Sequence, residues 1–197
     1  MKLIIANFIS YYTVVLLVVW ILLQLPLIRK SRGVTRLFLI VIFAILSIAL
    51  PLTSTIYGLV ENLSITLFMT LLVIHLKYIF NWDFTFNKSI AFIVVILGVL
   101  LYLSVLAFIP VDLYAWGYHP GLLMLIGIFL IGLVVLSMSR LAGWIILIAL
   151  VSYYFKLQFS VNLWDYLFDP VLWLFALLSL FKVKPQVDSY LIYDQNS

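Results

Sequence analysis

Residues 162–170, with the sequence Asn-Leu-Trp-Asp-Tyr-Leu-Phe-Asp-Pro, contain two carboxylates, one amide and two aromatic side chains that carry a polar atom. If this segment is helical, Asn162, Asp165 and Asp169 stand at positions i, i+3 and i+7 and share one face. A carboxylate in or near hydrocarbon is costly, so we expect these side chains to face protein, water or a partner. The segment is the sharpest polar feature of the sequence, although it names no reaction.

Most of these polar residues also have a purely structural interpretation. Asp169 precedes Pro170, and Asp is a favoured N-cap for a helix whose first residue is Pro. Tyrosines and tryptophans on this side fit an interfacial aromatic belt, and Lys156 fits a cation that extends towards the membrane surface. Asp165 is explained by neither capping nor topology. We therefore expect Asn to be tolerated at position 169 and to impair function at position 165.

The composition predicts a membrane protein. Hydrophobic residues make up 67% of the chain and charged residues 9%, with a mean hydropathy of +1.30. A soluble domain of 197 residues has too little interior for so many apolar side chains. The net charge of +4 does not indicate nucleic-acid binding, because the basic residues are distributed among short connections. Without cysteine, the chain has no disulfide, thiol nucleophile or Cys-ligated metal centre.

Apolar runs predict an all-α, polytopic transmembrane bundle of about seven helices, since a crossing needs roughly 20 apolar residues. We expect these spans at about residues 8–28, 37–52, 63–80, 90–109, 122–138, 141–155 and 163–183. Asn62 is the expected N-cap of the third span. Residues 171–183 alone are too short to cross. Either the last helix is broken near Pro170, which we prefer, or residues 162–169 lie at the outer interface and the final helix is short. If the last segment does not cross the membrane, the bundle has six spans.

The basic residues predict the orientation of the bundle. The first connection, with Arg29, Lys30, Arg32 and Arg36, is expected on the cytoplasmic side, which places the N-terminus outside. Because successive connections alternate between the two sides of the membrane, nine basic residues then lie inside, and only Lys2 and Lys156 lie outside. The inner residues are Arg29, Lys30, Arg32, Arg36, Lys77, Lys88, Arg140, Lys182 and Lys184. We expect residues 1–184 to form one transmembrane domain and residues 185–197 to form a short cytoplasmic tail.

This orientation gathers polar residues from separate connections at the outer face, which is the default site hypothesis for such a protein. The candidate outer-face polar site consists of Glu61, Asn62, Asp112, Tyr114, His119, Lys156, Asn162, Asp165 and Asp169. We expect Glu61, Asp112 and Asp165 to approach one another or to share waters. No residue is assigned a catalytic role, and no metal site or cofactor is predicted, because the sequence contains no H-E-x-x-H, G-x-S-x-G, P-loop or G-x-G-x-x-G motif.

Two classes of function remain open. The first is a non-catalytic subunit or assembly partner of a membrane complex, in contact with the lipid bilayer and a membrane-protein partner. The second is an enzyme or carrier that acts at the outer leaflet on a lipid-linked or amphiphilic substrate through the clustered carboxylates. Short connections and absent motifs favour the first class, whereas the clustered acids favour the second. We expect an integral protein of a bacterial cytoplasmic (inner) membrane.

The expected topology can be tested with reporter fusions. A reporter fused after Lys184 should be active on the cytoplasmic side, and one inserted between Val111 and Tyr118 should be active outside. The basis is the excess of basic residues in the inner connections. A carboxyl terminus found outside would contradict the topology.

Overall fold

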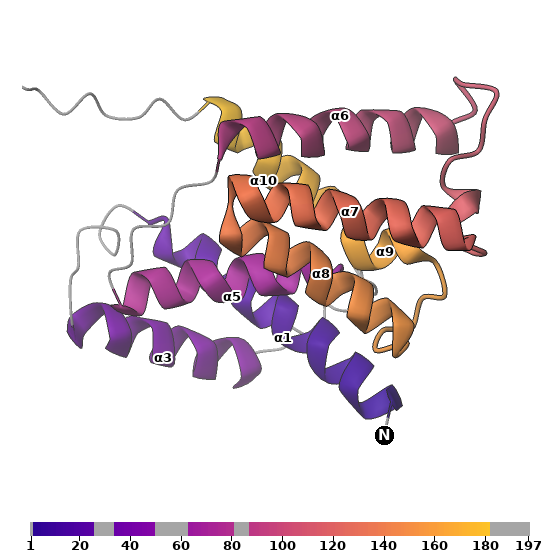
Figure 1. Cartoon of the computed structure of the whole chain (residues 1–197). Coiled ribbons are helices and arrows are strands. Elements are labelled where there is room, and N and C mark those ends of the chain that lie inside the picture. Colours follow the sequence, from indigo (N-terminus) through magenta and orange to yellow (C-terminus); the bar gives the residue numbers. More distant parts are fainter. Residues whose placement is uncertain (1, 26–33, 50–62, 81–86, 182–197) are drawn as a thin grey trace, which may run out of the picture.

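The computed structural model describes residues 2–25, 34–49, 63–80 and 87–181, and within these ranges the chain is helical and contains no strand (Figure 1). The prediction of an all-α fold is therefore confirmed. The elements are α1 (Lys2–Leu23), α3 (Val34–Ala49), α5 (Ile65–Phe80), α6 (Lys88–Val105), the 3-10 helix η1 (Ala115–Gly117), α7 (Leu122–Met138), α8 (Arg140–Tyr154), α9 (Leu163–Leu167) and α10 (Pro170–Phe181).

Every apolar run that we expected to be helical contains a helix, although the bounds differ. The first helix begins at Lys2, before the expected start at Phe8. Two helical stretches, Ile4–Leu23 and Lys88–Val105, are long and apolar enough to cross a membrane. The remaining long apolar helices of the described part have 10–17 residues, so the helix lengths do not confirm seven crossings. Glu61, Asn62 and the tail 185–197 lie outside the described residues.

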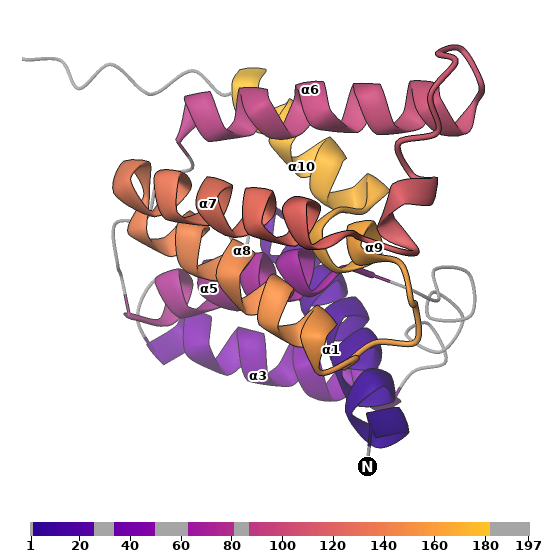
Figure 2. The same cartoon turned by 45° about the vertical axis from the view of Figure 1, so that its right-hand side comes forward.

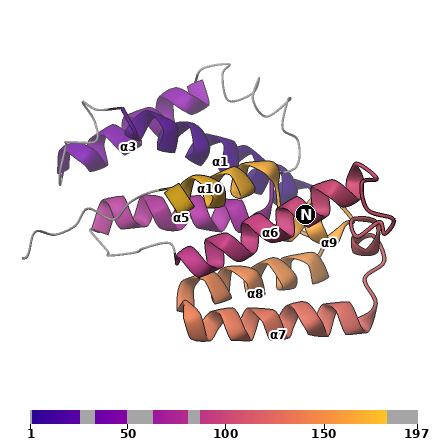
Figure 3. The same ribbon diagram turned by 90° about the horizontal axis from the view of Figure 1, so that it is seen from above.

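The helices form a layered bundle. Seen from above, α3 and α1 lie on one side and α8 and α7 on the other, with α5 and α10 between them (Figure 3). Helix α10 packs against both α6 and α5, and α8 packs against both α7 and α5. The largest buried apolar cluster joins α1, α5 and α10 through Val14, Leu67 and Leu172. Apolar burial therefore centres on α5, which touches four other long helices.

Helices α6, α7, α8 and α10 alternate in direction along the chain, so that the segments 106–121 and 155–169 meet at one end of the bundle (Figures 1 and 2). The predicted break near Pro170 is confirmed. Helix α9 ends at Leu167, Phe168 has an extended backbone, and α10 begins at Pro170. Pro lacks an N–H and has a fixed φ, which suits the first turn of a helix.

Two glycines allow helices to approach closely. A Cβ at position 143 would lie 2.3 Å from the Cα of Leu136, where α8 meets α7. A Cβ at position 98 would lie 2.2 Å from Cδ1 of Trp173, whose indole N–H donates to the carbonyl of Val95 at 3.1 Å. The first neighbour is backbone and cannot move aside, so Gly143 fixes the spacing of α7 and α8.

Gly143→Ala should therefore lower the stability of the bundle by about 1–3 kcal/mol, because a methyl group has no space between the two backbones. The matched control is Gly127→Ala, on the neighbouring helix, where a Cβ meets nothing within 4 Å. That change should be neutral, or stabilising by up to about 1 kcal/mol, because Ala favours a helix over Gly. Thermal unfolding in a neutral detergent, followed by circular dichroism, compares the two. Equal midpoints would contradict the close packing at Gly143.

Candidate functional site

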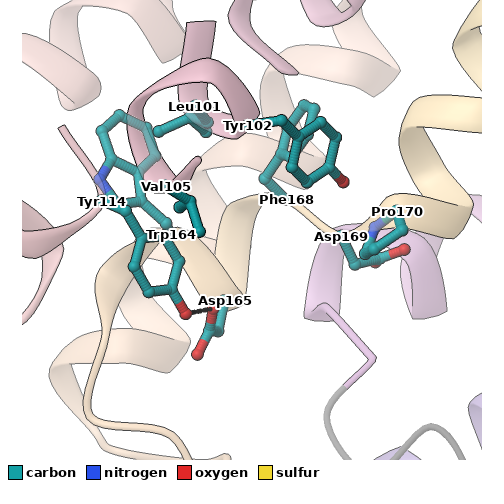
Figure 4. Close-up of a pocket in the computed structure, with 9 residues that line it drawn as sticks. All are labelled: Leu101, Tyr102, Val105, Tyr114, Trp164, Asp165, Phe168, Asp169 and Pro170. Carbon is teal, nitrogen blue, oxygen red and sulfur yellow. Dashed lines mark hydrogen bonds between the residues drawn. The ribbon is translucent and has the colours of Figure 1, made fainter. Parts of the chain in front are cut away.

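Asp165 lies in the first turn of α9, half-buried, and accepts two hydroxyl hydrogen bonds. The Tyr114 hydroxyl donates to its Oδ1 at 2.7 Å, and the Ser160 hydroxyl donates to its Oδ2 (Figure 4 draws the first contact). Tyr114 comes from the segment between α6 and α7, so this bond joins two connections. Among the described residues, no basic side chain pairs with this carboxylate.

Asn162 fixes the same two connections to each other. Its side chain is completely buried, its Oδ1 accepts the Trp164 N–H at 2.9 Å, and its Nδ2 donates to the Tyr114 carbonyl at 3.1 Å. Trp164 adds a bond from its indole N–H to the Leu113 carbonyl at 2.9 Å. A Cβ at Gly117 would lie 1.9 Å from the Asn162 Oδ1, so this close approach requires glycine. Asn162 is thus a structural N-cap and tie.

The condition under which Asn162, Asp165 and Asp169 would share one helical face is not met. Helix α9 covers only Leu163–Leu167, so that Asn162 stands at its N-cap and Asp169 lies beyond its end. Both flanking positions have extended backbone, in which helical spacing does not apply. The early end of the helix is explained by Pro170, because the residue before a proline is driven away from helical conformation.

Asp169 connects the first turns of two helices. Its side chain is 4% exposed, its Oδ1 accepts the Leu172 N–H at 2.8 Å, and its Oδ2 accepts both the backbone N–H of Ser64, at 3.1 Å, and the Ser64 hydroxyl. Ser64, and not Asn62 as the sequence predicted, caps α5, because the Oγ of Ser64 accepts the Leu67 N–H at 3.0 Å and α5 begins at Ile65. The predicted capping role of Asp169 is confirmed for α10, and the contact with α5 is an addition that the sequence did not reveal.

A second set of bonds holds the segment 158–166 against the start of α5. Gln158 donates from Nε2 to the Leu63 carbonyl at 2.6 Å, and Thr66 donates to the Tyr166 carbonyl at 3.1 Å. The buried Tyr166 hydroxyl lies 3.1 Å from the Ser160 carbonyl, to which it donates. Sequence reasoning missed Ser64 and Ser160 as partners of the two carboxylates. For Ser64, the available signal was the preference for serine as an N-cap.

Two pockets open beside this network. The first, of about 330 Å³, lies between α6 and the α9–α10 break (Figure 4). It is lined by Leu101, Tyr102, Val105, Tyr114, Trp164, Asp165, Phe168, Asp169 and Pro170. The second, also of about 330 Å³, is lined by Tyr118, His119, Tyr153, Lys156, Ser160, Val161 and Tyr166. The structure thus places His119 and Lys156 in a different pocket from the carboxylates.

Asp112 remains apart from this network. It is exposed, and its Oδ1 accepts the Ala115 N–H at 2.9 Å, which caps η1 locally. Because Glu61 and Asn62 lie outside the described residues, the expected approach of Glu61, Asp112 and Asp165 stays a prediction. Tyr114 is the member of the expected site that reaches Asp165 from the 106–121 segment.

Burial is the dominant electrostatic influence at this end of the bundle. Burial raises the pKa of Tyr114, and the hydrogen bond with Asp165 raises that pKa further because the carboxylate stabilises the protonated phenol. Burial also raises the pKa of Asp169, against the opposing effect of the hydrogen bonds from Ser64 and Leu172. Within the described ranges, no group of three or more His, Asp or Glu side chains could hold a metal ion. The arrangement places hydroxyl groups of Tyr114 and Ser160 against the carboxylate of Asp165, and the Ser64 hydroxyl against that of Asp169.

Comparison with known proteins adds no assignment. No protein-family model matches the chain, and no curated protein or solved structure matches it significantly.

Asp169→Asn should destabilise the protein by about 2–4 kcal/mol, because the amide nitrogen would face one of the N–H donors and leave it unpaired in a buried site. This reverses the tolerance expected from the sequence alone. Asp112→Asn is the matched control, since it removes the same charge at an exposed acid with one local bond. Chemical unfolding in detergent, followed by circular dichroism, measures both. Equal stability of the two variants would exclude the double-capping role of Asp169.

Proposed function

We propose that the protein is a multi-pass membrane protein of about seven spans, with the 106–121 and 155–169 end on the outer side. Three observations support this. Two helices have the length and hydropathy of membrane spans. Large apolar side chains are exposed along the described helices, which is costly in water. Helices α6 and α8 begin with Lys88 and Arg140 at the end opposite to Asp165, as the inner-side bias of basic residues requires.

Within that membrane setting, we propose that the protein is a non-catalytic subunit or assembly partner of a membrane complex. The polar end supports this class because its residues have structural partners. Asn162 accepts the Trp164 N–H and donates to the Tyr114 carbonyl. Asp169 accepts backbone N–H groups from two different helix starts. Asp165 accepts hydroxyl hydrogen bonds from Tyr114 and Ser160, so this carboxylate also has partners within the fold.

The surface of α7 that points away from α8 supports the proposal of a protein partner. Helix α7 packs mainly on α8, through a stripe that includes Ile128, Gly132 and Val135, and much of its remaining surface is exposed. On that exposed surface, Leu123 is 86% exposed and Gly127 has open space where a side chain would be. Helix association in a membrane depends on small residues that let two backbones approach closely. Gly127 therefore marks the contact point for a partner helix.

The two glycines of α7 have separate roles. A Cβ at Gly132 would meet Leu147 of α8 at 2.9 Å, so Gly132 serves the packing within the bundle. Gly127 is five residues away and is not needed for that packing. The five-residue spacing, which does not match G-x-x-x-G, is explained by two different partners rather than one.

The second class, a carrier or enzyme for an amphiphilic substrate, is favoured by one observation. The first pocket joins the apolar side chains of Leu101 and Val105 to the carboxylate of Asp165. An amphiphile needs both kinds of surface in one place. The pocket supports binding, whereas acid–base chemistry requires a residue for which the described network offers no candidate beyond Asp165.

Gly127→Leu tests the assembly role. The protein and its variants would be purified in parallel from their native membranes in a mild detergent. We expect the wild type to retain a stoichiometric membrane-protein partner and Gly127→Leu to lose it, because the added side chain separates the helices. Gly121→Leu is the control, since position 121 also has open space but precedes the helix. Absence of a stoichiometric partner from the wild type, or its retention by Gly127→Leu, would exclude this role for α7.

A further inference from the structure

The pocket beside Asp165 combines a carboxylate with aromatic walls. Tyr114 and Trp164 line it near the carboxylate, and Tyr102 and Phe168 line it further along (Figure 4). Each oxygen of Asp165 accepts one hydroxyl hydrogen bond, which leaves each with capacity for a further contact. Among the described residues, no cation pairs with this carboxylate, so its charge is available to a ligand.

The rings of this pocket are held in place by the fold. The Trp164 indole is tied to the Leu113 carbonyl at 2.9 Å, and the Tyr114 ring is held by its bond to Asp165 at 2.7 Å. Tyr102 packs edge-on against Phe168 with ring centroids 6.2 Å apart. A site whose walls are fixed before binding loses little conformational entropy when it binds. The faces of fixed aromatic rings attract organic cations.

We propose that this pocket binds the ammonium group of a cationic or zwitterionic amphiphile, with Asp165 as its counter-ion and the aromatic rings as its walls. The volume of about 330 Å³ is small for a whole amphiphile and suits a head group. The apolar chain would leave along α6, past Val105, which is 57% exposed. This site goes beyond the proposed docking role of α7 and does not depend on it.

The alternatives fit the pocket less well. An anion would lie against the carboxylate of Asp165, and the basic side chains His119 and Lys156 belong to the other pocket. A Ca²⁺ or Mg²⁺ ion needs about six oxygen ligands. In this pocket the second carboxylate, Asp169, already accepts three hydrogen bonds from Ser64 and Leu172. An organic monovalent cation requires only one carboxylate and aromatic surface.

The test uses the full chain, purified in a neutral maltoside detergent, and two probes with the same chain but opposite charge. Binding of octyltrimethylammonium and of octyl sulfate, each below its micelle concentration, is measured by isothermal titration calorimetry. We expect octyltrimethylammonium to bind at least about tenfold more tightly than octyl sulfate, because only the cation gains the carboxylate and the ring faces. Equal affinity for the two probes would overturn the proposal.

Variants assign the selectivity to this pocket. Asp165→Asn keeps the size of the side chain and its capacity for hydrogen bonds with Tyr114 and Ser160, and it should weaken octyltrimethylammonium binding by about tenfold. Asp112→Asn removes the same charge outside the pocket and should change the affinity by less than about twofold. Unchanged binding by Asp165→Asn would overturn the site.

A second wall residue keeps the test decisive if Asp165→Asn does not fold. Trp164→Leu removes one ring face and should weaken octyltrimethylammonium about threefold to tenfold, with little effect on octyl sulfate. Trp116→Leu is its matched control, because Trp116 is 56% exposed and does not line the pocket. Equal affinities of these two tryptophan variants would show that the cation binds elsewhere. If Asp165→Asn or Trp164→Leu still co-purifies with the α7 partner, the loss of cation binding is independent of the docking role.

Discussion

Two helix N-termini that lie 105 residues apart in sequence meet at one buried carboxylate, that of Asp169. One oxygen accepts the free N–H of Leu172 in α10, and the other accepts the backbone N–H and hydroxyl of Ser64, at the start of α5. Each helix N-terminus has unpaired N–H groups and a partial positive charge, so an acceptor placed between two of them stabilises both. The position of α10, and with it the α9 segment and the pocket, depends on this junction.

The network around the junction gives the bundle a defined arrangement that its apolar surfaces cannot provide. In the membrane setting proposed above, a Leu side chain would gain almost nothing by leaving the acyl chains for another helix, so helix pairing would depend on close packing and on polar contacts. The described helices supply both. Gly143 and Gly98 provide the close packing, whereas Asn162 and Asp169 provide the directional contacts. Such contacts at one end of the bundle set which helices are neighbours and in which register.

Hydropathy in the sequence was sufficient to place the helices, because an apolar run of helical length has few other structures available. The break at Pro170 was also predictable from the sequence, since proline restricts its own backbone conformation and that of the residue before it. The pairing of Ser64 with Asp169 was not, because nothing local links residues so far apart. The ends of two helices were also not predictable from the sequence. Ala107 and Lys156 follow these ends with positive φ values of 57° and 53°, a conformation in which glycine is the usual residue.

The same limit explains why the candidate site was only partly foreseen. The distribution of basic residues predicted which connections would share the outer face with the acidic residues. It gave no means of distinguishing one acidic residue from another. The structure distinguishes them by the donors that each one meets. Asp169 faces backbone N–H groups, which cannot turn away and therefore require an acceptor at all times. Asp165 faces two hydroxyls, from Tyr114 and Ser160, which can rotate to donate to the carboxylate or accept from a ligand. A carboxylate held by adaptable partners can exchange them for a ligand without unfolding a helix end. This difference in partners, rather than in charge, is the reason to propose Asp165 as a binding residue and Asp169 as a structural one.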